Sequence, residues 1–307
     1  MTAYIIRRVL MLIPIWFGIL VLTFLMRVLV PGDPIQLMFA GRFNDPAVEA
    51  TMRHKYGLDK PILTQFYDYT TGVLHGNLGY SITAQQPVTT MIKAHYPYTV
   101  VLTLTSLSIA VTIGLVSGII SAIKKDTIVD VISMIFALAG LSMPAFWLGL
   151  LMIYVFAVDL RWFPVLGSMT PKGIILPSVT LGVIASAVTA RLVRSTMLDV
   201  LGEDYVRTAR AKGITSFAVV LRHAFRNALI PIVTIVGLQF GGLLSGAFIV
   251  EVIFAWHGIG ELAITALQQR DFPLIQGIVL VVATTYVLVN LVVDLLYAVL
   301  DPRIAYK

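Results

Sequence analysis

EDYVRTARAKG, residues 203–213, is a short basic segment between two apolar runs, 174–200 and 227–255. Each run is longer than the roughly 20 residues that cross the hydrocarbon core of a bilayer. The segment therefore lies in water on one side of a membrane, and the runs that flank it make the chain a membrane protein. Because no catalytic machinery is evident in the rest of the chain, we interpret the segment as a contact for a soluble partner.

The composition of the whole chain supports this reading. Of its 307 residues, 58% are hydrophobic and 12% are charged, whereas soluble domains carry about 25% charged residues. The net charge of +6 is spread over the ends of apolar runs and short loops, which is typical of membrane orientation rather than of a nucleic-acid surface. We expect a lipid bilayer, and no nucleic acid, among the partners. The absence of cysteine excludes disulfides and thiolate chemistry.

Six apolar runs have the length of a membrane span and predict an all-α membrane protein with six transmembrane helices. The predicted spans are residues 9–30, 98–123, 128–158, 174–200, 227–255 and 274–300. The third contains Pro144, which predicts a kink or break near Ser142-Met143-Pro144. The first is too long for the apolar core of a signal peptide, so we expect it to remain in the mature protein.

The distribution of basic residues predicts the orientation of the spans. With the N-terminus in the cytosol, most Lys and Arg residues of the short loops lie on the cytosolic side. Six spans then place both termini in the cytosol and the 201–226 loop beside them. The polar 31–97 segment lies outside. We treat residues 1–307 as a single transmembrane domain that contains these two segments.

The external 31–97 segment is predicted to hold two short helices. Asp45 as N-cap and Pro46 at the first helical position indicate a helix that continues to Tyr56 and stops at Gly57. A second helical stretch is expected from Gln65 to Leu74. The segment therefore predicts a small ordered part over the outer face.

The cytosolic segment has the pattern of a helical hairpin. It begins with two acidic residues and ends with Arg210, Lys212 and Gly213, an order that suits the helix dipole and a glycine C-terminal stop. Thr215 or Ser216 can cap a second helix. The small side chains of Ala209 and Ala211 are interpreted as room for another protein. The alternative is a solvated loop that only obeys the positive-inside rule.

The segment Y-V-R-T-A-R-A-K-G, residues 205–213, resembles the cytosolic signature loop of permease subunits in ABC importers of the dipeptide and oligopeptide type. The general pattern of that loop is E-A-A-x-x-x-G. Here Arg207-Thr208-Ala209 stands in place of E-A-A, and Gly213 is the glycine. Similar motifs cover nearly the whole chain: Pro31-Gly32-Asp33-Pro34, Tyr56-Gly57-Leu58-Asp59, His75-Gly76-Asn77-Leu78-Gly79, Arg194-Ser195-Thr196-Met197-Leu198, Arg270-Asp271-Phe272-Pro273 and Leu300-Asp301-Pro302-Arg303. One departure is His257, where relatives usually have proline.

The resemblance implies a type I ABC importer permease fold in a bacterial inner membrane, forming half of a translocation pore. It implies three kinds of partner: a homologous second permease, two cytosolic ABC ATPases and an external substrate-binding protein. The substrate would be a dipeptide or oligopeptide, with glutathione or nickel as alternatives. The residues that would contact the ATPase are Tyr205, Arg207, Thr208, Ala209, Arg210, Ala211, Lys212 and Gly213.

Other motifs give no sign of a catalytic, metal or cofactor site. Gly258-x-Gly260-x-x-Ala263 matches a dinucleotide fingerprint only formally, because it follows a membrane span and no βαβ unit surrounds it. No G-x-x-x-x-G-K-S/T occurs, so we expect ATP and magnesium to be bound by the partner ATPases. The five histidines lack the spacing of metal ligands.

Four residues are candidates for the lining of the pore or its gate. Met143, Pro144 and Phe146 at the break of the third span are candidates, although a simple packing kink explains them equally well, and Gln239 is a polar residue within the fifth span.

The acidic residues of the spans bear on a competing hypothesis. Asp130, Glu251 and Asp294 are expected near span ends, and Asp294 is expected to pair with Arg191 or Arg194. A self-contained secondary carrier or channel would need a charge in mid-membrane or an internal repeat. A membrane scaffold for a soluble complex would share the basic loop but move no substrate.

Overall fold

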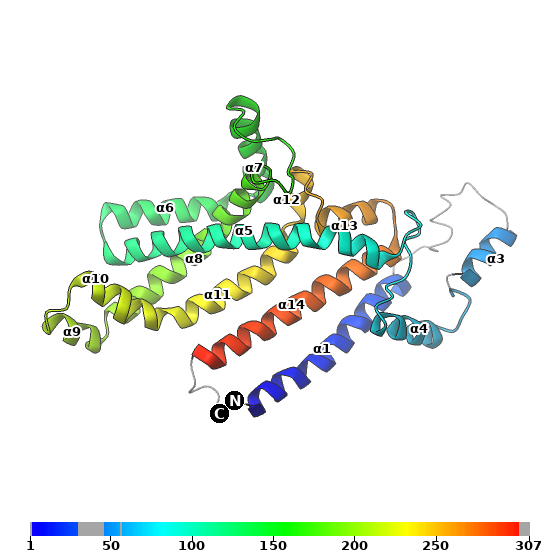
Figure 1. The fold of residues 1–307 in the computed structure, drawn as a ribbon, viewed down its shortest axis with the longest axis horizontal. Coiled ribbons are helices and arrows are strands. Elements are labelled where there is room, and N and C mark those ends of the chain that lie inside the picture. Colours follow the sequence, from blue (N-terminus) through cyan, green and yellow to red (C-terminus); the bar gives the residue numbers. More distant parts are fainter. Residues whose placement is uncertain (1, 30–45, 56, 301–307) are drawn as a thin grey trace.

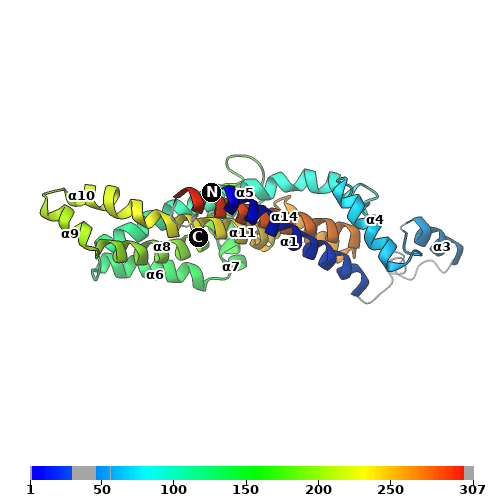
Figure 2. The same ribbon diagram turned by 90° about the horizontal axis from the view of Figure 1, so that it is seen from below.

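The computed structural model describes residues 2–29, 46–55 and 57–300, and Figure 1 shows an elongated assembly of helices. Figure 2, turned by 90°, shows that the assembly is rather flat. The helices α9 (Asp204–Ala211) and α10 (Ser216–Ala218) lie at one end of the long axis, and α3 (Pro46–Lys55) and α4 (Ile62–Leu74) lie at the opposite end. No strand occurs among the described residues, which confirms the all-α prediction.

Among the described residues, four helices are each long and apolar enough to cross a membrane alone, and two bent helix pairs bring the number to six when each pair is counted as one span. Counted in this way, the structure agrees with the six predicted spans, four of them as single helices. These four are α1 (Thr2–Leu29), α5 (Val88–Ile123), α8 (Ile175–Leu201) and α14 (Phe272–Leu300). Of the four, α8 is buried most completely by the rest of the chain, whereas α1 and α14 expose most of their surface.

The third span breaks where proline predicts it. Helix α6 (Ile128–Ser142) and the pair α7 (Ala145–Met152) and η1 (Ile153–Asp159) meet at an angle of 103°. Met143 between them is extended, with φ −86° and ψ 125°, because a residue before proline avoids the helical region. The turn sends α7 away from the bundle (Figure 1).

The fifth span is also bent, which the sequence analysis did not predict. It runs from Val219 to Leu244 through η2 (Val219–Ala224) and α11 (Phe225–Gly246). Its two arms meet at 53° just before Pro231, whose ring removes a backbone donor and crowds the preceding turn. The predicted run to residue 255 ends earlier, because α12 (Phe248–Ile253) follows as a separate short helix.

The most extensive helix pairing of the structure joins α5 to α8. Glycines on both helices allow the two backbones to approach closely. A Cβ added at Gly118 would lie 2.7 Å from the carbonyl oxygen of Ala190, and one added at Gly182 would lie 2.7 Å from Ile109 Cγ2. Small residues at such crossings are the usual basis of helix association in lipid.

Ion pairs join further spans. Arg194 of α8 donates to both carboxylate oxygens of Asp130 in α6, at 2.7 and 2.6 Å. Arg8 of α1 pairs with Asp294 of α14 at 2.8 Å. The predicted pairing of Asp294 with Arg191 or Arg194 is therefore wrong, because Asp130 takes Arg194 and α14 packs on α1 rather than on α8.

The described part of the 31–97 segment contains both predicted helices. The first is α3 (Pro46–Lys55), and its expected N-cap and last residue lie outside the described residues. The second is α4 (Ile62–Leu74), which begins three residues before the predicted start. Helix α4 packs on α1 through Phe24 and Phe66, whose ring centroids lie 5.2 Å apart.

A buried carboxylate holds α12 against its neighbours. Glu251 of α12 is fully buried and accepts hydrogen bonds from the Thr99 hydroxyl at 2.6 Å and from the backbone N–H of Gly260 at 2.6 Å. It thereby caps the first turn of α13 (Ile259–Gln268). The sequence places Glu251 near a span end, but only the fold brings it to a helix N-terminus nine residues away.

We expect Gly118→Ala to destabilise the protein by about 1–3 kcal/mol, because the added methyl group overpacks the α5–α8 crossing. The matched control is Gly242→Ala in α11, where a Cβ meets nothing within 4 Å. The control should be neutral or stabilising by up to about 1 kcal/mol, since alanine favours helix. Thermal unfolding of the purified protein in detergent measures both, and equal shifts for the two variants would refute the close-approach argument.

Candidate coupling surface and translocation path

Helix α9 (Asp204–Ala211) is the predicted contact segment, and it lies beyond the end of α8 at the tip of the molecule (Figure 1). The chain turns back there through α10, so the two form the predicted helical hairpin. The first turn of α1 and the last turns of α14 point toward this same end of the assembly.

The local sequence explains where α9 begins and ends. Its N-cap residue Glu203 is extended, and the last turn carries Arg210. Gly213 has φ +75°, a conformation that costs other residues about 1 kcal/mol or more. The N–H of Gly213 donates to the carbonyl of Arg210 at 3.0 Å, and the N–H of Ile214 donates to the carbonyl of Ala209 at 3.3 Å. These are the two hydrogen bonds of a Schellman stop.

One face of α9 packs against the chain itself. Val206 and Ala209 are buried and form a small cluster with Val219 of η2, against which Leu201 and Ile214 also pack. Ala209 therefore packs inside the hairpin. The interpretation that its small side chain leaves room for another protein is wrong. The fold decides this because η2 returns along that face. Only Ala211 of the two alanines is exposed.

The other face of α9 is exposed and basic. The predicted contact residues that lie on it or at its end are Tyr205, Arg207, Thr208, Arg210, Ala211, Lys212 and Gly213. The hydroxyl of Tyr205 accepts a hydrogen bond from Asn227 of α11 at 2.6 Å. Arg207 forms a long, exposed ion pair with Asp204, at 3.7 Å, a type that contributes little to stability.

The candidate gate residues lie on two sides of α8. Met143, Pro144 and Phe146 are exposed at the bend between α6 and α7. Gln239 of α11 instead links two spans: its Nε2 donates to the carbonyl of Ala185 and its Oε1 accepts from Thr189, both at 3.0 Å. Both polar atoms of the Gln239 side chain are therefore hydrogen-bonded to α8. The role of Gln239 in a pore stays a prediction.

Two family models match the chain and divide it between them. Residues 114–306 match the model described as binding-protein-dependent transport system inner membrane component. Residues 1–103 match the model of the N-terminal part of such membrane components. The chain belongs to this family of transport permeases. It is thus a multi-pass permease subunit of an ABC importer, a class that works with an ATPase and other subunits.

Curated relatives match this permease over its full length. It is 47% identical to the glutathione transport system permease protein GsiC of Pectobacterium atrosepticum and 45% identical to GsiC of Escherichia coli, with 100% of each chain covered. It is 44% identical to the di/tripeptide transport system permease protein DppB of Pseudomonas aeruginosa, again with 100% of both chains covered.

Solved structures support the fold of the permease. An inward-facing MetNI methionine ABC transporter matches with a TM-score of 0.60 and 17% identity, over 69% of this chain and 96% of that chain. An amino acid ABC transporter matches with a TM-score of 0.53 and 18% identity, over 70% of this chain and 94% of that chain. The type I ABC importer permease fold predicted from the sequence is therefore confirmed.

Sequence reasoning named the exposed contact residues of α9 but missed the residues that hold it in place. Val206 and Val219 hold α9 in place. The sequence signal for Val206 was the apolar spacing of residues 206 and 209 on one helix face. The sequence could not show which segment covers that face. The partner of Tyr205, Asn227, lies 22 residues away and was equally unpredicted.

We expect Ala209→Glu to unfold the hairpin locally, because a carboxylate would enter the cluster of Val206 and Val219 without a hydrogen-bond partner, at a cost of about 2–4 kcal/mol. Hydrogen–deuterium exchange should show faster exchange of the α9 amides while the spans stay protected. Thr208→Glu adds the same charge on the exposed side and should leave exchange unchanged. Equal exchange in both variants would contradict the inward orientation of Ala209.

Proposed function

We propose that this permease forms half of the translocation pore of an importer for short peptides, glutathione among them, and that α9 is its coupling helix. The observation that carries the proposal is the two-sided character of α9, with one face anchored to the chain and the other basic and exposed at the tip of the molecule. A soluble partner that binds such a helix can displace it, and the helix can transmit that displacement to the spans.

Contacts around α9 connect it to two of the spans. Leu201, at the end of α8, packs against the cluster of Val206 and Val219, and Asn227 ties Tyr205 to α11. Gln239 then links α11 to the middle of α8. Movement of α9 therefore displaces α8 and α11 together as a rigid unit. Reorientation of these spans would alternate the pore between outward-facing and inward-facing states.

The proposed assembly contains a homologous second permease, two cytosolic ATPases and an external substrate-binding protein. ATP and magnesium would reside in the ATPases, since this chain has no P-loop sequence, and the permease itself would not be catalytic. Placing α9 in the cytosol puts the start of α1 and the end of α14 there too, because all three lie toward the same end of the molecule (Figure 1). This is the orientation expected from the basic residues.

Peptides are favoured as the substrate because the full-length relatives are named for glutathione and for di- and tripeptides. Glutathione is itself a tripeptide, so one substrate class covers both names. Nickel remains the alternative substrate from the sequence. A self-contained ion-coupled carrier is less well supported, because two acidic residues of the spans, Asp130 and Asp294, are each paired with an arginine.

Reversing the charge of the exposed face of α9 tests the coupling role. We expect the double variant Arg207→Glu/Arg210→Glu to insert normally and to lose at least about tenfold in uptake rate, because complementary contacts become repulsive ones. The matched control is Lys124→Glu/Lys125→Glu, two exposed cations in the loop after α5. Uptake and ATPase activity are measured in the reconstituted importer. Normal uptake in the α9 variant would exclude this helix as the coupling element.

A transport assay on the intact importer tests the substrate. In cells that lack this permease, we expect uptake of labelled glutathione or of a dipeptide such as dialanine to fall to background and to return with the restored gene. Nickel uptake serves as the control and should stay unchanged. Loss of nickel uptake with normal peptide uptake would overturn the peptide proposal.

A further inference from the structure

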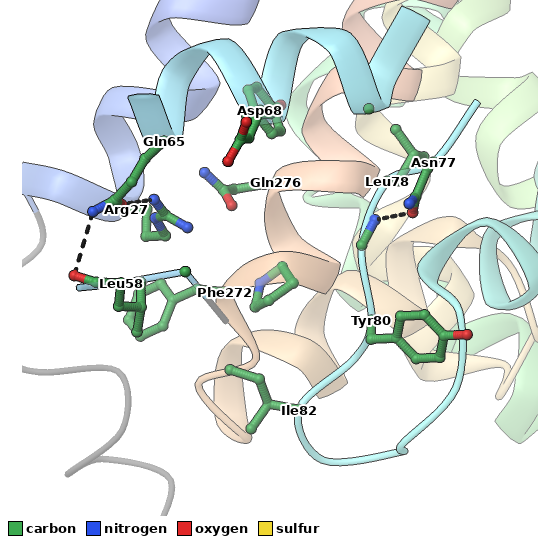
Figure 3. Close-up of a pocket in the computed structure, with 15 residues that line it drawn as sticks. Arg27, Leu58, Gln65, Asp68, Asn77, Leu78, Tyr80, Ile82, Phe272 and Gln276 are labelled. Carbon is green, nitrogen blue, oxygen red and sulfur yellow. Dashed lines mark hydrogen bonds between the residues drawn. The ribbon is translucent and has the colours of Figure 1, made fainter. Parts of the chain in front are cut away.

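A cavity of about 230 Å³ lies where α1, α4 and α14 meet, at the end of the molecule opposite α9. Figure 3 shows Arg27 of α1, Asp68 of α4 and Gln276 of α14 converging on it from three helices. Apolar side chains, among them Leu58 and Phe272, complete the lining. The cavity therefore presents a cation and an anion side by side on an apolar wall.

Arg27 is half-buried, and the described residues occupy only part of its hydrogen-bonding capacity. It donates from Nη2 to Oε1 of Gln65, and its guanidinium lies over the ring of Phe24, 5.3 Å from the centroid. Among the described residues no carboxylate reaches it at ion-pair distance. A guanidinium has five N–H donors in a planar fork that suits phosphate and carboxylate groups. Within the part of the chain that the structure describes, most of these donors are available to a ligand anion.

Asp68 offers the opposite charge on the other side of the cavity. Its Oδ2 accepts a hydrogen bond from Lys60 at 2.6 Å, which leaves Oδ1 for a second cation. Gln276 is buried between the two charges, held by a hydrogen bond from its Nε2 to the carbonyl of Thr23 at 2.8 Å. The site thus fits a small zwitterion with its anionic group at Arg27 and its ammonium group at Asp68.

The position of Arg27 along α1 places the cavity at the depth of lipid headgroups. The span of α1 ends at Leu29, two residues after Arg27. On the membrane side of Arg27, α1 turns the apolar side chain of Leu22 outward, 65% exposed, and at the end of the span Leu29 is 72% exposed. On α4, Leu63 is 83% exposed. Exposed apolar surface next to a charged pocket suits a ligand that has acyl chains as well as a charged headgroup.

We infer that this cavity binds the headgroup of a zwitterionic phospholipid of the phosphatidylethanolamine class. The phosphate contacts Arg27, the ammonium contacts Asp68, and the acyl chains run along the exposed face of α1. The primary ammonium matters because it donates hydrogen bonds to a carboxylate, whereas a trimethylated choline has no N–H. A free peptide carries the same pair of charges, but neither the apolar flank nor the membrane depth is needed to hold one. The inference does not depend on the transported substrate.

Native mass spectrometry of the full chain, released from nanodiscs made of equal parts phosphatidylethanolamine, phosphatidylcholine and phosphatidylglycerol, tests the site. We expect one retained phosphatidylethanolamine, enriched at least about fivefold over either other lipid. Arg27→Gln and Asp68→Asn should each lower that occupancy about tenfold or more, the scale of a charge-assisted contact. Arg161→Gln, an exposed arginine after η1 that does not line the cavity, is the matched control. Melting temperatures report whether each variant is folded.

Soluble competitors distinguish the possible sources of the zwitterion. Glycerophosphoethanolamine should displace the retained lipid at high concentration, whereas dialanine and glutathione should not. Displacement by the peptides at lower concentration would overturn the lipid assignment and make the cavity a peptide site. Equal retention of all three lipids, or unchanged retention in folded Arg27→Gln and Asp68→Asn, would also overturn it. Because uptake is not the readout, the result is independent of the coupling and substrate tests.

Discussion

The close approach of α5 and α8 is the constraint on which the rest of this structure depends. In a bilayer, lipid tails solvate an apolar side chain as well as a neighbouring helix does, so burial of leucine gives little reason for two helices to associate. Gly118 and Gly182 instead let backbones come close enough for many weak contacts to accumulate. Polar contacts then fix how the two helices are oriented, such as the hydrogen bond between the Thr105 and Ser178 hydroxyls at 2.7 Å.

Around that pair, prolines and polar contacts determine how the remaining spans are placed. Pro144 turns the third span by 103° and Pro231 bends the fifth by 53°, so neither forms a straight rod against α8. Gln239 and Arg194 each hold a neighbouring span to α8 through hydrogen bonds. Helix α8 therefore connects the bend at one side, α11 at the other and the coupling hairpin at its end. A central helix with such links is well suited to transmit a displacement.

Prediction from the sequence succeeded where one segment decides its own structure. The six spans, the break at Pro144 and the stop of α9 at Gly213 each follow from local length, proline chemistry or a positive φ. It failed where a second segment decides. Asp294 pairs with Arg8, 286 positions away in a chain of 307 residues, and Ala209 faces η2 rather than a partner. The charged cavity at Arg27 was missed for the same reason, because its three walls come from α1, α4 and α14.

The sequence by itself determined that this protein spans a membrane as helices, since only intrahelical hydrogen bonds satisfy the backbone of a 20-residue apolar run in hydrocarbon. It also determined the position of the exposed basic helix at residues 204–211, because that charge pattern cannot enter the bilayer. Only the tertiary structure decided which face of that helix is free, which acids pair with which arginines and that Glu251 caps α13. Those outcomes depend on residues distant in the chain, and no local preference specifies which distant segment packs against a given helix.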